Sequence, residues 1–213
     1  MIFEPKYIYY LLMTICFVIS IFASLKDKSI KPVFYLLLLS LITEIFVEVV
    51  LFKKQNFYYI YHIYTPLEYL FISYYFLSVN HNKRIAYAIK ISALVFTLFC
   101  IYSAIRIVPF NEYPGLTYNA EGVLVIIFSI ITLFNLHPQQ NIKIQQLPVF
   151  WFCLAFLVFY SGIFFINFLY NTLLKQNNEV VKMLYKAITL LFNYILYFMI
   201  LIGLICSRKM KKL

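Results

Sequence analysis

The stretch that decides the fold is PVFYLLLLSLITEIFVEVVLF, residues 32–52. Its only charged residues are Glu44 and Glu48. At a rise of about 1.5 Å per residue, a helix of this length crosses the hydrocarbon core of a bilayer, which is about 30 Å thick. Because lipid offers the backbone no hydrogen-bond partner, the stretch must form a helix there. It is therefore expected to be a transmembrane helix.

The rest of the chain repeats this pattern. Of its 213 residues, 64% are hydrophobic and 12% are charged, and the mean hydropathy is +0.86. Soluble domains carry about 25% charged residues, so the composition predicts an integral membrane protein. The expected helices cover residues 7–25, 32–52, 57–79, 85–108, 119–136, 148–171 and 183–206. We therefore predict an all-α, polytopic membrane protein, a single bundle of seven transmembrane helices over residues 1–213, with a basic tail at 207–213.

Lysine and arginine are distributed unevenly between the two ends of these helices. One end has Lys26, Lys28, Lys31, Lys83, Arg84, Lys143, Arg208, Lys209, Lys211 and Lys212, whereas the other end has Lys6, Lys53, Lys54, Arg106, Lys175 and Lys182. The more basic end is expected to be cytoplasmic, which places the N-terminus outside and the C-terminus inside. With a net charge of +10, the basic tail is expected to bind anionic lipids, and no nucleic-acid partner is expected.

Acidic residues inside the apolar stretches are the first candidates for function, because a charge at the bilayer centre costs at least about 2.5 kcal/mol. Glu44 and Glu48 are four residues apart, so they share one face of their helix, with Ser40 one turn earlier. Glu68 shares a face with Tyr64, four residues before it. His62 is six residues from Glu68, about 120° around the helix, so these two side chains are expected to have different partners.

The last two expected helices each carry one polar stripe. Tyr160, Asn167 and Asn171 recur at helical spacing in one, and Lys186 and Asn193 recur in the other. We expect these stripes to face the interior of the bundle, where polar side chains find hydrogen-bond partners.

With the N-terminus outside, these polar residues fall between the external surface and the bilayer midplane. Residues of the external half are Glu48, His62, Glu121, Asn167 and Lys186, and residues near the midplane are Glu44, Glu68, Tyr160 and Asn193. The arrangement predicts a polar cavity that opens to the external side. The predicted ligand- or proton-binding residues are Glu44, Glu48, His62, Glu68, Tyr160, Asn167, Lys186 and Asn193.

A purely structural role is the alternative for several of these residues. Asparagines and tyrosines in helical bundles often only bond across helices, at about 0.6 kcal/mol each. Lys186 is expected to lie three residues inside its helix, where its ammonium group can reach the membrane surface instead of pairing with Glu48 or Glu68. His62, one turn inside its helix, can be a histidine of the membrane interface.

Metal and cofactor chemistry have little support in the sequence. There are three histidines, and His81 and His137 fall in expected loops, so no zinc site is predicted. The four cysteines, Cys16, Cys100, Cys153 and Cys206, lie in apolar runs without a CxxC pair. We expect them to be small buried hydrophobic residues, and we predict no metal and no cofactor.

Three stretches together resemble a known family: YHIYTPLEYLF at 61–71, FWFCLAFLVFYSG at 150–162 and NYILY at 193–197. The family consists of small bacterial seven-helix membrane proteins without an established activity. It has an aromatic-rich Tyr-x-x-x-Glu helix, a helix that begins with PheTrp, and a final Asn-x-x-x-Tyr helix. The resemblance covers almost the whole chain and implies a multi-pass protein of the bacterial cytoplasmic (inner) membrane.

Three functions remain open from the sequence. The leading hypothesis is a non-enzymatic membrane sensor or receptor-like protein, which acts through a protein partner on the cytoplasmic side. The second is a transporter, channel or pore-forming accessory, for example of an RNA-guided CRISPR defence system, for which a homo-oligomer is expected. The third, an enzyme that acts on a lipid or isoprenoid, would use Glu44 or Glu68 as general acid and base.

Overall fold

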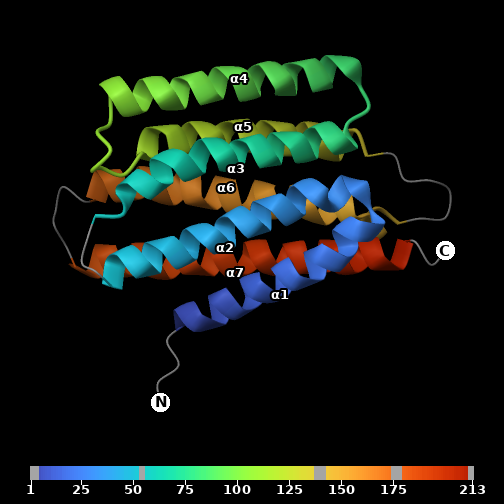
Figure 1. The fold of residues 1–213 in the computed structure, drawn as a ribbon, viewed down its shortest axis with the longest axis horizontal. Coiled ribbons are helices and arrows are strands. Elements are labelled where there is room, and N and C mark those ends of the chain that lie inside the picture. The colour runs from blue at the N-terminus through green and yellow to red at the C-terminus, as the bar shows by residue number, and fades with distance from the viewer. Residues whose placement is uncertain (1–4, 53–55, 137–142, 174–178, 211–213) are drawn as a thin grey trace. The chain divides into compact units, whose positions relative to one another are not determined.

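The structure is a computed structural model that describes residues 5–52, 56–136, 143–173 and 179–210. These residues form seven α-helices and no β-strand, as the sequence predicts (Figure 1). The helices are α1 (Pro5–Lys26), α2 (Lys31–Phe52), α3 (Tyr58–Val79), α4 (Lys83–Arg106), α5 (Gly115–Phe134), α6 (Pro148–Leu173) and α7 (Glu179–Met210). Two short 3₁₀ turns, η1 (Lys28–Ile30) and η2 (Ile144–Gln146), precede α2 and α6.

Six of these helices are long and apolar enough to cross a membrane: α1, α2, α4, α5, α6 and α7. The chain is thus compatible with a multi-pass membrane protein. Helix α3 does not belong to this set, because its many tyrosines, together with His62, Pro66 and Glu68, make it less apolar. That α3 also crosses the bilayer, and that the N-terminus lies outside, stay predictions.

Two helices differ from their predicted bounds in a way that matters for the site. Helix α5 begins at Gly115, whereas the sequence predicted 119. Helix α7 begins at Glu179 and continues to Met210, whereas the prediction was 183–206. Hydropathy marks where a helix enters lipid, but its hydrogen-bonded turns continue into the polar region beyond. Residues 211–213 of the predicted tail lie outside the described residues.

The chain divides into two compact units. Unit 1 comprises Met1–Ile19 and Val125–Leu213, and unit 2 comprises Ser20–Leu124. In unit 2, helices α2, α3 and α4 follow one another as neighbouring antiparallel helices, and η1 packs against α2 and α3 (Figure 1). In unit 1, α6 and α7 pack against each other, and η2 packs against α6.

In unit 2, side chains cap α4 at its start and form contacts between α3 and α4. The Asn82 side chain caps α4 by accepting a hydrogen bond from the Arg84 backbone N–H (2.9 Å). The Tyr69 hydroxyl of α3 lies 2.9 Å from the Ser92 hydroxyl of α4. The Tyr69 ring also meets the Phe96 ring edge-on, with centroids 4.6 Å apart. Helices α3 and α4 are therefore joined by polar and aromatic contacts at one level.

The α6–α7 pair of unit 1 depends on two glycines that make room for aromatic rings. The Phe192 ring of α7 lies directly over Gly162 of α6, where a Cβ atom would collide with it. The Phe152 ring of α6 lies over Gly203 of α7, and a Cβ placed there would be 2.8 Å from Cε1. Small residues bring helix backbones close in membranes, where packing drives association. Each helix thus supplies one glycine and one ring.

Candidate functional site

Glu68 of α3 is the buried acid around which the candidate site of unit 2 is built. Its side chain is only 7% exposed. The Tyr64 hydroxyl, one turn earlier on α3, donates a hydrogen bond to Glu68 Oε1 (2.8 Å). The same hydroxyl lies 3.2 Å from Ser40 Oγ on α2. We call Ser40, Tyr64 and Glu68 the carboxyl chain; it links α2 and α3.

The protons of the carboxyl chain can be counted. Tyr64 has one hydroxyl proton, which it donates to Glu68, so its oxygen can accept from Ser40. Ser40 also lies 3.0 Å from the Leu36 carbonyl oxygen on its own helix, and its single proton can serve only one of these two acceptors. Which oxygen donates and which accepts along the carboxyl chain therefore depends on whether Glu68 is protonated.

Glu44 and Glu48 of α2 have a different environment. Both side chains are partly exposed, and the buried positions of α2 near them are Thr43 and Val47. The i, i+4 spacing does put both acids on one face, but that face is not the most buried face of α2. Of the three acids that the sequence predicted to be deep, Glu68 is the one whose side chain is buried.

Glu121 is a fully buried acid of unit 2 (0% exposed) that is not among the predicted binding residues. The Glu121 carboxyl lies within electrostatic range of Tyr69 of α3 and Cys100 of α4. The prediction began the helix at residue 119, which made Glu121 a terminal residue near the membrane surface. Because α5 begins at Gly115, Glu121 lies almost two turns inside the helix. The sequence signal that could have identified Glu121 as a buried acid is its position within an extended apolar run.

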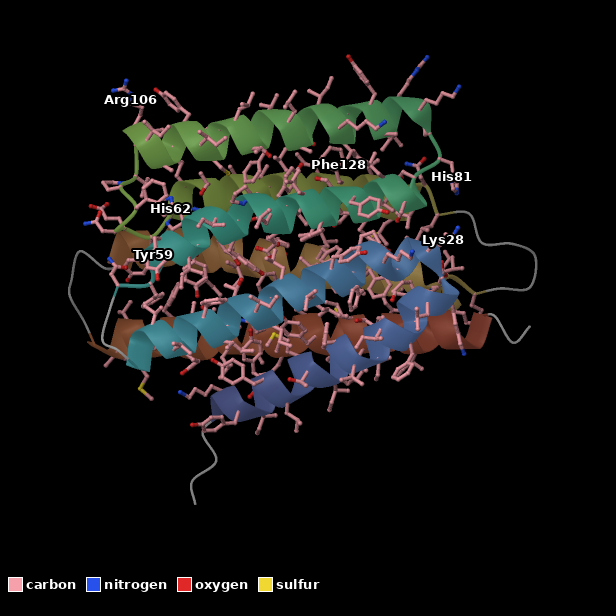
Figure 2. All side chains as sticks on the ribbon, viewed as in Figure 1. Lys28, Tyr59, His62, His81, Arg106 and Phe128 are labelled. Atoms are coloured by element: carbon pink, nitrogen blue, oxygen red, sulfur yellow. The ribbon has the colours of Figure 1, made fainter. Side chains whose placement is uncertain are left out.

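His62 belongs to the end of unit 2 where α3 begins (Figure 2). Its Nε2–H donates to the Glu112 carbonyl oxygen (3.0 Å), and its ring lies 5.0 Å from the Phe110 ring. The Asn56 side chain donates to the neighbouring Asn111 carbonyl (2.7 Å). His62 therefore attaches the loop between α4 and α5 to the start of α3. These contacts of His62 differ from the hydrogen bond between Tyr64 and Glu68.

The remaining predicted residues belong to unit 1. Tyr160 and Asn167 are buried on α6, and the Tyr185 hydroxyl of α7 donates to Asn167 Oδ1 (3.0 Å). Asn193 Nδ2 donates to the Thr189 carbonyl oxygen of its own helix (2.9 Å), whereas the sequence predicted a bond across helices. In a continuous helix, the carbonyl four residues earlier is always within reach of a short amide side chain.

Lys186 is exposed on α7 and lies deeper along its helix than predicted, because α7 begins at Glu179. The Asn171 side chain and His137 lie outside the described part of the structure. Since the predicted binding residues are shared between both units, the single cavity that would join them stays a prediction.

Among the described residues, no group of three or more His, Cys, Asp or Glu side chains is placed to hold a metal ion. The four cysteines are free thiols, of which Cys16, Cys100 and Cys153 are buried. The Cys16 thiol donates to the Tyr197 carbonyl oxygen of α7 (3.2 Å), within unit 1. The prediction of four buried cysteines is wrong for Cys206, which is only half-buried.

Comparisons with protein-family models, with curated proteins and with solved structures gave no match. The class of protein is therefore defined by its fold, an all-α bundle with six helices suited to cross a membrane. The resemblance to bacterial seven-helix membrane proteins stays a prediction.

Proposed function

We propose that this chain is a non-enzymatic membrane sensor whose responding group is the Glu68 carboxyl. The observation that carries the proposal is the carboxyl chain, in which one buried acid is linked through Tyr64 to Ser40 of the neighbouring helix. A change at Glu68 thereby reaches a contact between two helices. A sensor needs such a coupling between a local event and helix packing.

Gain of a proton is the event that fits this arrangement. An ionised Glu68 accepts from Tyr64, which leaves the Tyr64 oxygen to accept from Ser40. A protonated Glu68 can donate to Tyr64, and Tyr64 then donates to Ser40, whose own proton goes to Leu36. Protonation thus reverses the direction of the Ser40–Tyr64 hydrogen bond, which joins α2 and α3. A small cation near the carboxylate would favour the first of these two states.

Unit 2 contains further acids besides Glu68. Glu44 lies one turn after Ser40 on α2, and Glu121 of α5 lies within electrostatic range of Tyr69, the residue after Glu68. A buried carboxyl is stable in the interior with a proton or with a hydrogen-bond partner, and Tyr64 can serve Glu68 in both states.

The test measures the distance between α2 and α3 as the pH changes. Spin labels are placed at the exposed positions Ile42 and Ile63 in a variant without the native cysteines, reconstituted in lipid nanodiscs. Between about pH 8 and pH 4, a range that covers an ordinary and a raised carboxyl, the distance is expected to change. Glu68→Gln should abolish the change, while Glu112→Gln, an exposed loop acid, should preserve it.

An unchanged distance in the parent protein, or the same change in Glu68→Gln, would contradict the proposal. A proton or ion flux through liposomes that depends on Glu68 would replace the sensor with a transporter or channel. We also propose that the sensor acts through a protein partner on the cytoplasmic side. Cross-linking in cells from the cytoplasmic end of the chain would test whether such a partner binds.

A further inference from the structure

A basic and aromatic stripe on the outer surface of α4 is the feature that the proposed function does not use. Lys83, Tyr87 and Lys90 are separated by four and three residues, so they share one face of the helix. All three are exposed, Tyr87 by 68%. The next residue on this face, Leu94, is 64% exposed and apolar. The stripe thus changes from basic to apolar along a helix suited to cross a membrane.

Lys90 lies well inside the apolar part of this helix. The 24 residues of α4 give a length of about 36 Å, some 6 Å more than the hydrocarbon core. With Lys83 and Arg106 outside the core at its two ends, the Lys90 backbone lies about 10 Å along the helix from Lys83, roughly 7 Å inside the core. A lysine side chain points toward the start of its helix and can reach the headgroup level from there.

The charge around the stripe is positive. Helix α4 has no acidic residue. At the same end of unit 2, Figure 2 shows Lys28, which belongs to η1. This turn contacts the end of α3, where the Ser78 hydroxyl donates to the Ser29 carbonyl oxygen (3.4 Å). The one acid beside η1, Asp27, accepts from the Ser29 N–H and hydroxyl. A negative ligand is therefore favoured at this end.

We propose that Lys83, Tyr87 and Lys90 bind the phosphate group of an anionic phospholipid from the side of α4. The two ammonium groups lie above and below the phosphate, and the Tyr87 hydroxyl donates to it. The first acyl carbons of the lipid lie along Leu94. The site is distinct from the basic tail at 207–213 and requires nothing of Glu68.

Arg106 supplies a matched control, because it is an exposed cation of the same helix at the opposite end (Figure 2). The full chain is reconstituted in phosphatidylcholine vesicles that contain spin-labelled phosphatidylglycerol or phosphatidylcholine. The ratio of immobilised phosphatidylglycerol to immobilised phosphatidylcholine measures selectivity. Near a membrane surface, one lysine contributes about a fivefold preference for an anionic lipid.

We expect Lys90→Gln to lower the selectivity about fivefold and Lys83→Gln to lower it by a similar factor, while Arg106→Gln leaves it within about twofold. Lys90→Arg, which keeps the charge, should retain the selectivity. Equal losses in Lys90→Gln and Arg106→Gln would show only general attraction to anionic lipid and would overturn the site. If Lys90→Gln does not fold, Lys83→Gln and Tyr87→Leu decide the question in the same assay.

Two other results would also overturn the proposal. Disulfide cross-linking between copies that carry Lys90→Cys in a cysteine-free chain would show that a second copy covers the stripe. Inorganic phosphate that abolishes the phosphatidylglycerol selectivity at millimolar concentration would show a site for free phosphate instead of a lipid.

Discussion

Removing the Tyr64 hydroxyl tests whether Ser40, Tyr64 and Glu68 act as one unit. Tyr64→Phe removes two contacts, the 2.8 Å bond to Glu68 and the 3.2 Å contact with Ser40. Hydrogen bonds to charged groups contribute about 1.5–3 kcal/mol in water-soluble proteins, and bonds within membrane bundles reach about 1.7 kcal/mol. We expect Tyr64→Phe to lower the free energy of unfolding by about 1.5 kcal/mol.

Ser40→Ala should have a smaller effect, about 0.5 kcal/mol, because the Ser40–Tyr64 contact is long and Ser40 shares its proton with the Leu36 carbonyl. If Ser40, Tyr64 and Glu68 act together, the free energy of unfolding of the double variant should fall by about 1.5 kcal/mol instead of the additive sum of about 2 kcal/mol. The missing 0.5 kcal/mol or so is the coupling across α2 and α3.

The assay is reversible unfolding in mixed micelles of increasing SDS content, followed by circular dichroism, for the parent and the three variants. The same cycle with Glu112→Gln in place of Ser40→Ala is the control, since this loop acid should show no coupling to Tyr64. Strict additivity of Ser40→Ala and Tyr64→Phe, or a larger effect of Ser40→Ala, would refute the linkage between the helices.

Three further predictions concern other parts of the chain. Gly162→Ala should lower the thermal unfolding temperature, because its Cβ would collide with the Phe192 ring, whereas Gly115→Ala, with its nearest contact at 3.5 Å, should be tolerated. His62→Ala should raise amide hydrogen exchange in the loop around Glu112, which loses its bond to Nε2; unchanged exchange would contradict that role. Trp151, the single tryptophan, donates to a backbone carbonyl beside the start of α6, so lipids brominated near the headgroup should quench its fluorescence more than lipids brominated near the chain ends.

Most of the fold could be predicted from hydropathy alone. Residues 32–52 are helical almost as predicted, because an apolar run of membrane length has one stable backbone solution in lipid. The structure differs from the prediction at the helix ends, where polar residues continue the helix beyond the apolar run. The early start of α5 and the extension of α7 are examples. Helix ends depend on capping and loop contacts, which hydropathy does not report.

The candidate site was predictable residue by residue but not as a set of contacts. The spacing of Tyr64 and Glu68 at i, i+4 put both on one face, and their hydrogen bond follows from it. The sequence places Ser40 one turn before Glu44 and does not indicate that it contacts Tyr64. Its contact with Tyr64 depends on how α2 and α3 align, which is set by side-chain packing along both helices.

Burial separates the acids in a way that charge alone could not. Glu44, Glu48, Glu68 and Glu121 all interrupt apolar runs, but the side chains of Glu44 and Glu48 lie at a partly exposed edge of α2. Glu68 and Glu121 have no such edge, and each therefore needs a protein partner or a proton to be stable in the interior. The charge of such a buried carboxyl depends on its surroundings, so a change in these surroundings can change its protonation state. We therefore assign the sensing response to Glu68 of α3 and not to Glu44 and Glu48 of α2.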